Sequence, residues 1–206
     1  MPVSFTAAEI AQKYDSLAAY YDRVELAAEF FLLSRLRRAC FRRATGDVLE
    51  VAVGTGGNLK FYRAGCRITA IDVSQGMLEQ ARRHAEKLKL KVDFQLMDAT
   101  ALRFPDNSFD TVTSSLSTCT FPDPIVVLRE MARVCRDDGH ILLLEHGRSS
   151  VKLFGWLQDR LADWHARRVA CHWNRDPAGM VLQARLRLLS DQAHLFGVVH
   201  MIEAAP

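Results

Sequence analysis

Between residues 48 and 146, short runs rich in β-branched residues alternate with helical patterns, and this alternation restricts the fold more than any other feature of the chain. The strand-like runs are VLEVAV (48–53), RITAID (67–72), KVDFQLMD (91–98), FDTVTSSLS (109–117) and HILLLEH (140–146). Strands that alternate with helices form a parallel sheet, because each crossover lays a helix on one face. Two further runs, RLRLLS and GVVHMIEA, are joined by too few residues for a crossover and must be antiparallel. We therefore predict an α/β fold with a doubly wound, seven-stranded, mostly parallel sheet.

The remaining segments are predicted to be mainly helical. In residues 1–46 apolar side chains recur at the steps of four and three that mark one helical stripe; they are Ile10, Tyr14, Leu17, Tyr21 and Val24. A second helix around Phe30, Leu33, Leu36 and Cys40 should end near Gly46. Further helices are predicted at 58–65, at 74–90 with Ser74 as N-cap, at 122–139 ending at Gly139, and at 151–171. With 206 residues, the chain has room for a single domain, 1–206.

The composition points to a folded protein without metal or disulfide scaffolding. The chain is 49% hydrophobic and 25% charged, and no run approaches the roughly 20 apolar residues that cross a bilayer. Its five cysteines form no CxxC pair, and His165 and His172 lack an evident third ligand, so no metal is predicted. The start, MPVSFTAAEI, does not resemble a secretory signal. We expect a cytoplasmic protein, or one peripheral on an intracellular membrane, with the mitochondrial membrane as one option.

Positive charge is concentrated in two stretches. Residues 30–46 carry five arginines and no acid, and residues 148–175 carry six basic residues and two acids. Such stretches favour an anionic partner, either lipid headgroups or nucleic acid, although solvated helix faces have the same composition. The chain has no nucleic-acid recognition module, so nucleic acid is not expected and an anionic membrane surface is the better candidate. The sequence makes no prediction of the oligomeric state.

The turn in LEVAVGTGG (49–57) follows the first strand, where ligands bind in open parallel sheets. Gly54 and Gly56, with Thr55 between them, permit positive φ and close approach of a ligand to the backbone. A dinucleotide site would need a third glycine three residues after Gly56, but that position is Leu59. The turn therefore fits a nucleotide-like ligand without a pyrophosphate better than NAD.

Two acids end the next two strands. Asp72 ends the second strand at the distance at which a carboxylate accepts from both ribose hydroxyls, and Asp98 ends the third. A carboxylate at Asp98 is placed to accept from the exocyclic amine of an adenine. An acidic site of this kind suits an adenosine that carries a positive charge, and S-adenosyl-L-methionine is such a ligand.

The motifs resemble those of class I S-adenosylmethionine-dependent methyltransferases over nearly the whole chain. "VLEVAVGTG" is similar to the first motif of this family, with Ala52 where a glycine is usual, and "ITAIDVSQGMLEQAR" and "LMDATALRFPDNSFDTVTSS" are similar to the next ones. The fifth, "VVLREMARVCRDDG", has Asp137-Asp138 where Lys/Arg-Pro-Gly is commoner. The resemblance implies a Rossmann-like methyltransferase fold and a cofactor site formed by Glu50, Ala52, Gly54, Thr55, Gly56, Asp72, Val73, Met77, Asp98, Ala99 and Ser115.

Two further segments resemble particular groups within this class. "YDSLAAYYD" (14–22) is similar to the opening of the ubiquinone/menaquinone methyltransferases, in which the opening helix folds over the cofactor. This likeness implies that residues 1–46 form a lid over the core, 47–206, with Tyr14 and Tyr21 near the methionine end; both tyrosines also fit a core stripe. "LLLEHGRSS" and "WLQDRLADWHARRVACHWNRD" resemble small membrane-associated methyltransferases, which include thiol, mitochondrial inner-membrane and phospholipid methyltransferases. The implied acceptor is a small molecule that is apolar or membrane-derived.

His146 is the candidate catalytic residue because it directly follows the fifth strand. An imidazole there can take a proton from an acceptor, or it can be a hydrogen-bonded wall residue. The cluster that runs from His172 to Asp176 either forms the floor of an acceptor pocket or caps the helix that precedes it and buries the indole of Trp173. Two other functions stay open: a non-catalytic methyltransferase-like assembly factor, and a nicotinamide-dependent oxidoreductase, which Leu59 disfavours.

Overall fold

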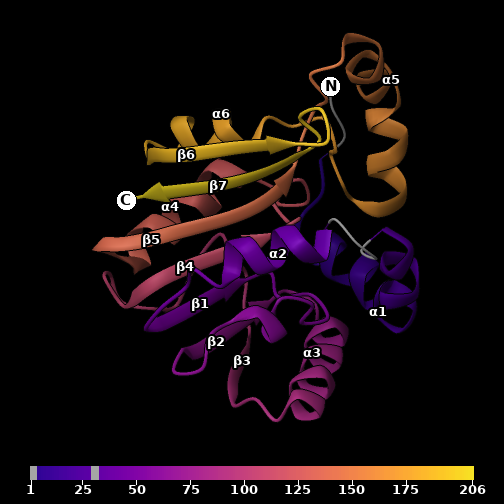
Figure 1. The fold of residues 1–206 in the computed structure, drawn as a ribbon. Helices are drawn as coiled ribbons and strands as arrows, with labels where there is room; N and C mark the ends of the chain where they lie inside the picture. Colours follow the sequence, from indigo (N-terminus) through magenta and orange to yellow (C-terminus); the bar gives the residue numbers. More distant parts are fainter. Residues whose placement is uncertain (1–3, 29–32) are drawn as a thin grey trace.

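The computed structural model describes residues 4–28 and 33–206, of which 19–28 are described by their backbone alone. The strands are β1 Asp47–Val51, β2 Arg67–Asp72, β3 Val92–Leu96, β4 Phe109–Ser115, β5 Cys135–His146, β6 Arg187–His194 and β7 Val199–Ala205. The helices are α1 Ala7–Ala28, α2 Ser34–Phe41, α3 Gln75–Leu88, α4 Pro124–Val134, α5 Lys152–Val169 and α6 Pro177–Gln183, with a short 3₁₀ helix, η2, at Leu59–Phe61. Figure 1 shows these elements in the order of the chain.

The seven strands form one sheet in the order β3-β2-β1-β4-β5-β7-β6. The strands from β1 to β5 pair in parallel, and β7 is antiparallel to both β5 and β6. The predicted doubly wound sheet with an antiparallel final hairpin is therefore confirmed. The chain runs outward from β1 to β3 and then returns to place β4 on the other side of β1. This reversal opens a crevice at the carboxyl ends of β1 and β4, where such sheets bind ligands.

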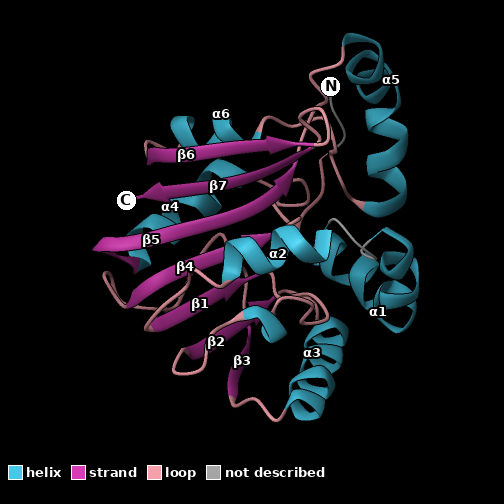
Figure 2. Cartoon of the chain, in the orientation of Figure 1, coloured by secondary structure: helices cyan, strands magenta, loops and turns pink. Residues whose placement is uncertain are grey.

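Helices cover both faces of the sheet, as the magenta strands between cyan helices in Figure 2 show. On one face α4 and α6 pack on alternate strand residues, among them Val51, Ile141 and Ile202. On the other face α2 packs against Val48, Leu142 and Leu144, and α3 packs against β2. Alternate residues of β1 and β5 thus face opposite layers, which is why these central strands are apolar along their length.

Two sequence predictions about helices were wrong, and one helix was missed. The helix predicted to reach Gly139 ends at Val134, and β5 begins at the next residue, Cys135. Gly139 lies inside β5, and a Cβ there would come within 2.8 Å of the backbone oxygen of Asp110 in β4. Gly139 therefore permits a close approach of two strands and does not cap a helix.

The helix predicted at 58–65 is limited to η2, because Tyr62 is extended and its buried hydroxyl contacts Thr113 Oγ1 in β4 at 2.8 Å. Helix α6 was not predicted; Asp176 caps it by accepting from the amide of Gly179 at 3.0 Å. The predicted N-cap at Ser74 is confirmed, since its hydroxyl accepts from the amide of Met77 at 3.1 Å. Phe30 lies outside the described residues.

Helix α1 packs across the start of α3. Asp15 Oδ1 accepts from the amide of Gly76 at 2.9 Å and from the hydroxyl of Ser74 at 2.5 Å. A side chain at position 76 would crowd Asp15 and Ala18 at 3.2–3.3 Å, so Gly76 allows this approach. In Figure 1, α1 and α5 lie beyond the carboxyl end of β5. No helix in the described ranges combines the length and hydropathy that a bilayer crossing demands.

Candidate functional site

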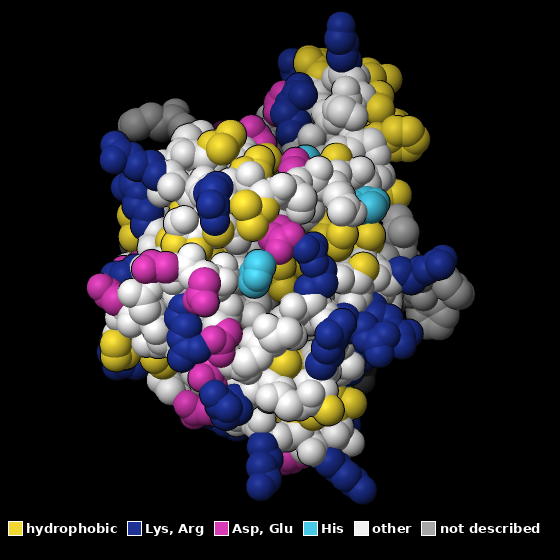
Figure 3. Space-filling model, turned by 60° about the vertical axis from the view of Figure 1, so that its left-hand side comes forward, with side chains coloured by type: hydrophobic (Ala, Val, Ile, Leu, Met, Phe, Trp, Pro, Cys, Tyr) yellow, Lys and Arg dark blue, Asp and Glu magenta, His cyan; other side chains and the backbone are white. Residues whose placement is uncertain are grey.

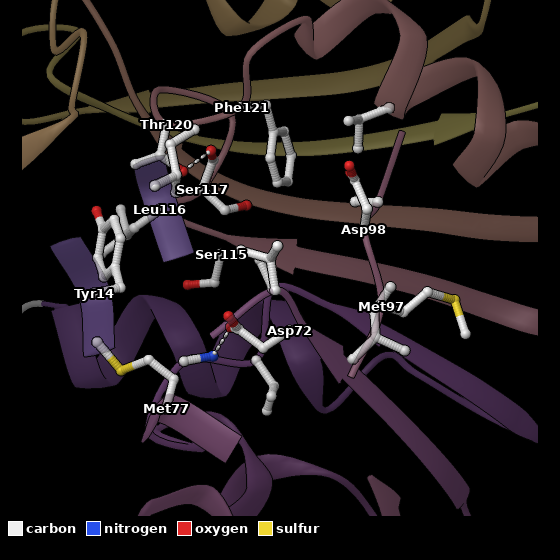
Figure 4. Close-up of a pocket in the computed structure, with 18 of the residues that line it drawn as sticks. Tyr14, Asp72, Met77, Met97, Asp98, Ser115, Leu116, Ser117, Thr120 and Phe121 are labelled. Atoms are coloured by element: carbon white, nitrogen blue, oxygen red, sulfur yellow. Dashed lines mark hydrogen bonds between the residues drawn. The ribbon is translucent and has the colours of Figure 1, made fainter. Parts of the chain in front are cut away.

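A cavity lies at the carboxyl ends of β1, β2 and β4, at the reversal of strand order. Its wall combines the turn after β1, the ends of β2, β3 and β4, and side chains of α1 and α2. Ten of the predicted cofactor residues line it: Tyr14, Ala52, Gly54, Thr55, Asp72, Val73, Met77, Asp98, Ala99 and Ser115. Figure 4 shows Tyr14, Asp72, Asp98 and Ser115 arranged around this cavity. Glu50 and Gly56 do not line it, and the side chain of Tyr21 lies outside the described residues.

The two glycines of the turn have different tasks. Gly54 has φ +55°, and a Cβ built on it would meet no atom within 4 Å. That Cβ would occupy open space of the cradle, so the absence of a side chain leaves room for a ligand against the backbone. Gly56 has φ +84°, and its Cβ would lie 2.8 Å from Leu59 Cδ1 and 3.3 Å from Ala81. Gly56 therefore serves the packing of the turn against α3.

Asp72 is the acid that the turn is built around. It is only 8% exposed, and its Oδ2 and Oδ1 accept from the amides of Gly54 at 2.8 Å and Ser74 at 2.9 Å. Burial raises the pKa of this carboxyl to about 6, although the amide hydrogen bonds favour the ionised form. A carboxylate has lone pairs beyond the two that are used here, so Asp72 keeps acceptor capacity for a ligand hydroxyl in the cavity.

Asp98 stands on the other side of the cavity, one residue after Met97, which also lines it. Its Oδ1 accepts from the amide of Thr100 at 2.8 Å, which fixes the carboxylate at the start of the loop after β3. Ala99 is packed against the core below this loop. Two separated carboxylates, which accept hydrogen bonds, and the open backbone at Gly54 suit a cationic adenosine derivative.

Arg37 and Asn58 are cavity residues that the sequence interpretation missed. Arg37 is 6% exposed and donates from Nη1 to Asn58 Oδ1 at 2.5 Å and to Ser115 Oγ at 2.9 Å. The sequence contained an indication of this position. Arg37 falls on the same helical face as the apolar residues Leu36, Cys40 and Phe41, and this face of α2 is buried. An arginine on an apolar helical stripe differs from the solvated arginines around it.

Glu50 extends the hydrogen-bonded series of Ser115, Arg37 and Asn58 and lies below the cavity. Its Oε1 accepts from Asn58 Nδ2 at 2.8 Å, and the carboxyl is almost fully buried. Burial raises the pKa of Glu50 to about 7. The predicted cofactor residue Glu50 therefore holds Asn58, which lines the cavity, and does not itself reach the space in which a ligand would lie.

The N-terminal helix closes the cavity on one side. Ala7, Ile10 and Tyr14 of α1 line it, and the Tyr14 hydroxyl donates to the backbone oxygen of Val169 at 3.4 Å. Lys13 also donates to the backbone of the α5 region, to Arg167 O at 2.7 Å. Helix α1 thus bridges α3 and the end of α5 beside the cavity.

A second crevice lies beside the first, and His146 lines it. Its wall is mostly apolar and consists of Leu33, Leu36, Leu116, His146, Gln158, His165, Cys171, Trp173, Leu195, Val198 and Val199. Leu116 lines both cavities. It adopts φ +53°, an uncommon conformation for a side chain of this size, and its amide donates to Leu144 O at 2.8 Å. His146 is therefore next to the first cavity but outside it.

The polar groups of the second crevice are close together. His146 Nε2 lies 3.3 Å from Cys171 Sγ. Burial opposes protonation of His146, but the contact with Cys171 prevails and raises the pKa of the imidazole. Hydrogen bonding from Cys119 lowers the pKa of the Cys171 thiol, and contacts with His146 and His165 lower it further. This crevice thus combines an apolar wall with one thiol–imidazole pair.

The residues from His172 to Asp176 follow α5, whose C-cap is Ala170, so they do not cap that helix as one of the two alternatives expected. Trp173 lines the second crevice, stacks on His165 with ring centroids 4.3 Å apart, and donates from Nε1 to Gln158 O at 3.1 Å. Asp176 caps α6. Arg175 donates to the backbone oxygens of Thr118 and of Phe121, which ties this segment to the loop after β4.

Comparison with known proteins gives the family. Residues 49–143 match the methyltransferase domain family. The chain is 43% identical over 103 residues to the phosphatidylethanolamine N-methyltransferase of Cereibacter sphaeroides, a match that covers 49% of this chain and 51% of that protein. It is 32% identical over 193 residues to the demethylmenaquinone methyltransferase of Paenarthrobacter aurescens, which covers 91% of this chain and 75% of the relative. The chain therefore belongs to the S-adenosylmethionine-dependent methyltransferases, as its motifs predicted, and it spans about half the length of the first of these relatives.

A solved structure shows the same fold with a product of this cofactor bound. The chain superposes with a TM-score of 0.74 on the geranyl diphosphate C-methyltransferase of Streptomyces coelicolor A3(2), determined with Mg²⁺, geranyl diphosphate and S-adenosyl-L-homocysteine. The match covers 100% of this chain and 99% of that chain, at 12% identity. At this identity the likeness concerns the fold alone.

The residues of the first cavity fit S-adenosylmethionine. The open cradle at Gly54 accommodates a ligand against the backbone, and Asp72 retains acceptor capacity for hydroxyls. Arg37 is the cation that lines the cavity close to Ser115, and its planar donor fork suits a carboxylate. The cofactor carries both hydroxyls and a carboxylate, so each of these groups has a partner in it.

Proposed function

We propose that this protein transfers the methyl group of S-adenosylmethionine to a small, apolar acceptor that binds in the second crevice. The observation that supports this proposal is the shared wall at Leu116, which places an apolar crevice next to the cavity that fits the cofactor. Methyl transfer needs the acceptor atom in line with the breaking carbon–sulfur bond, and two adjoining cavities provide such alignment. The apolar walls also exclude water from the reaction.

The cofactor residues have separate roles in this proposal. Asp72 holds the ribose hydroxyls, Asp98 and Ala99 face the adenine, and the turn at Gly54 contacts the methionine part. Arg37 holds the methionine carboxylate. Tyr14 and α1 cover the cofactor and act as the lid. The cofactor supplies the reactive methyl, and these residues position it, since little covalent chemistry is required of the protein.

The acceptor that we propose is membrane-derived. The names of two relatives give phosphatidylethanolamine and demethylmenaquinone as their acceptors. The second crevice is suited to such molecules, because apolar side chains dominate its wall and only a few polar groups, among them His146 and Gln158, interrupt it. His146 is proposed to face the acceptor there and to take its proton.

We further propose that α5 places the protein on an anionic membrane surface. Its buried face consists of Gly155, Ala162 and Ala166, whereas its large apolar side chains point outward. Leu153 is 67% exposed, and Phe154, Trp156, Leu157 and Trp164 are also exposed. Helices of this kind lie in the interface of a bilayer, with arginines at the headgroups.

Charge and position support the membrane surface. Arg160 lies over the Trp156 ring at 5.3 Å, and Arg168 lies over the Trp164 ring at 4.4 Å. In Figure 3 the projection at the top of the molecule, formed by α5, carries yellow apolar side chains among dark blue basic ones. Phe196 in the β6–β7 turn is 72% exposed, and its neighbour Leu195 lines the second crevice. An acceptor could thus pass from the lipid to the crevice without crossing water.

A transfer assay tests the proposed function. The protein is incubated with S-adenosylmethionine labelled in the methyl group and, separately, with phosphatidylethanolamine, a demethylated quinol and an alkyl thiol in mixed vesicles. We expect one acceptor class to gain label, and we expect the Asp72→Asn variant to lose at least tenfold in rate. Tight cofactor binding without transfer to any of them would instead favour the assembly-factor alternative. Thermal stabilisation by NADH would favour the oxidoreductase.

A further inference from the structure

Two thiols and an imidazole meet beside the second crevice, and two of these residues, His146 and Cys171, line it. The ligand atoms of Cys119, His146 and Cys171 all lie within 4.8 Å of one another, and the two thiols are buried. The residues are 27 and 25 positions apart in the chain, so no short spacing motif links them. The sequence interpretation considered only CxxC pairs and the pair His165 and His172, and it therefore missed this cluster.

Three different elements hold the cluster in place. His146 is the last residue of β5, and Cys171 follows the end of α5. Cys119 lies in the loop after β4, which the buried carboxylate of Glu145 fixes by accepting from the amides of Ser117 at 2.9 Å and Thr118 at 3.1 Å. The amide of His172 donates to Cys119 O at 2.9 Å, which joins this loop to the segment of Cys171. The three ligand residues are therefore held near one another by backbone contacts of β5 and of the two loops beside it.

We propose that Cys119, His146 and Cys171 bind a transition-metal ion of the zinc class. Two thiolates and one imidazole are ligands that such ions prefer over carboxylate and carbonyl oxygens. In a tetrahedral zinc site the ligand atoms lie roughly 3.5–3.8 Å apart. The Sγ–Nε2 separation of Cys171 and His146 is 3.3 Å, and no pair in the cluster exceeds 4.8 Å. Shifts of up to about 1 Å would thus complete the geometry.

Three protein ligands leave one coordination position open, as in zinc sites that bind a further ligand. His146 and Cys171 line the second crevice, so this position faces the crevice. A bound ion would use the lone pair of His146 Nε2, and His146 could not then serve as a base at that atom. With the ion bound, His146 would therefore not take the acceptor's proton as proposed above. Metal binding is measured without turnover, so failure of the metal site and failure of the proposed methyl transfer are distinguishable.

Titration with Co²⁺ tests the site directly. The reduced full-length protein is titrated without oxygen, and thiolate-coordinated Co²⁺ is followed by its charge-transfer absorption and the visible bands of tetrahedral cobalt. We expect one Co²⁺ per chain, displaced by Zn²⁺. The variants Cys171→Ser and Cys119→Ser are each expected to lose the charge-transfer band or most of its intensity. Cys66→Ser is the matched control, since this half-buried thiol lies apart from the cluster and contacts Ala44 O at 3.5 Å.

Three outcomes of the titration would overturn the proposed metal site. A charge-transfer band that survives in both Cys171→Ser and Cys119→Ser, or that disappears in Cys66→Ser, overturns the assignment. Absence of the band in the folded, fully reduced parent protein also overturns it. Circular dichroism shows whether each variant is folded, and if one serine variant is not, the loss of the charge-transfer band is judged in the other one. A shift of the visible cobalt bands in His146→Gln with the charge-transfer band retained would identify His146 as the nitrogen ligand.

Discussion

Arg37 Nη1 lies 2.9 Å from Ser115 Oγ and donates to it, and this contact connects α2 with the end of β4 across the edge of the cofactor cavity. The same nitrogen donates to Asn58, which in turn donates to the buried Glu50. A cation is thus anchored where a helix, a turn and a strand end meet. Its position makes Arg37 the first candidate for recognition of the cofactor carboxylate.

Replacing Arg37 by Gln is expected to weaken binding of S-adenosylmethionine by about 10- to 100-fold, the loss of a charged hydrogen bond. Decarboxylated S-adenosylmethionine lacks the carboxylate, so the same variant should bind it almost as well as the parent protein does. Isothermal titration calorimetry of the parent protein and the variant with both ligands gives the coupling energy between the Arg37 side chain and the cofactor carboxylate. Arg38→Gln is the control, because Arg38 is exposed on the same helix. Equal losses for the two ligands would contradict the role given to Arg37.

The cofactor affinity is expected to depend on pH through Asp72. Its pKa is raised to about 6 in the folded protein, so below about pH 6 this carboxyl holds a proton that a cationic ligand must displace. The dissociation constant should be level above about pH 7 and rise about tenfold per pH unit well below pH 6. For folding, the sign is opposite: the stabilisation from the buried neutral carboxyl is complete below the unfolded pKa and is lost as pH rises toward 6.

Two variants separate Asp72 from its titrating neighbours. Asp72→Asn should bind weakly and without this pH dependence. Glu50→Gln removes another buried carboxyl, whose pKa is about 7, and should keep the slope below pH 6 because Glu50 does not line the cavity. The exposed Asp15 faces Asp72 from α1 and is left unchanged in both. An unaltered slope in Asp72→Asn would assign the effect to another group.

Gly54→Ala is expected to reduce cofactor affinity by more than tenfold, because its methyl group would occupy the cradle. The backbone strain at φ +55° costs about 1–2 kcal/mol of stability in addition. Gly65→Ala is a matched control: this glycine also has positive φ, +100°, and also has no atom within 4 Å of its Cβ position, but it lies in an exposed turn. Both variants should lose similar stability in urea. Only the first should lose binding, and a loss in both would show that strain alone is responsible.

The sequence was sufficient to predict the sheet and to bring together many of the residues that line the first cavity, for a physical reason. Strand and helix periodicities are local, and the carboxyl ends of parallel strands meet at one edge, so Gly54, Asp72 and Asp98 could be placed together without coordinates. The position of Ser74 as a helix cap is likewise a local property. These predictions required no knowledge of side-chain packing.

The residues that were missed or misplaced depend on long-range contacts. Arg37 reaches the cavity only because α2 packs beneath it, and Cys119 meets Cys171 only through the sheet. In the sequence Gly139 resembles a helix end, but in the structure it lies against the backbone of Asp110 in β4. Helix propensity at 58–65 was overridden by the contact between Tyr62 and Thr113. Local patterns contain no information about such neighbours.

Substitution of Trp156 and Trp164 by Ser is expected to reduce binding to anionic vesicles by more than tenfold. Both rings are about half exposed, and burial in the bilayer interface would no longer stabilise the bound state. Cosedimentation with vesicles that contain or lack phosphatidylglycerol, at low and high salt, measures this effect. Leu182→Ser is the control, since Leu182 is 58% exposed on α6. Equal binding to neutral and anionic vesicles, or no change in the double variant, would contradict the membrane surface.

Ala52 occupies the position where the first motif of this family usually has glycine, and its backbone explains the usual choice. Its φ is +55°, in the left-handed region that costs an L-residue about 1–2 kcal/mol. Ala52→Gly removes this strain but adds about 0.5–1 kcal/mol of conformational entropy to the unfolded chain. The net expectation is a free energy of unfolding that is higher by about 0.5–1 kcal/mol, seen as a higher urea midpoint at constant slope. Ala99→Gly is the control, because Ala99 also packs against the core but has no positive φ; it should destabilise. If both changes lowered stability equally, the turn at Ala52 would be held without strain, and alanine would be as suitable there as glycine.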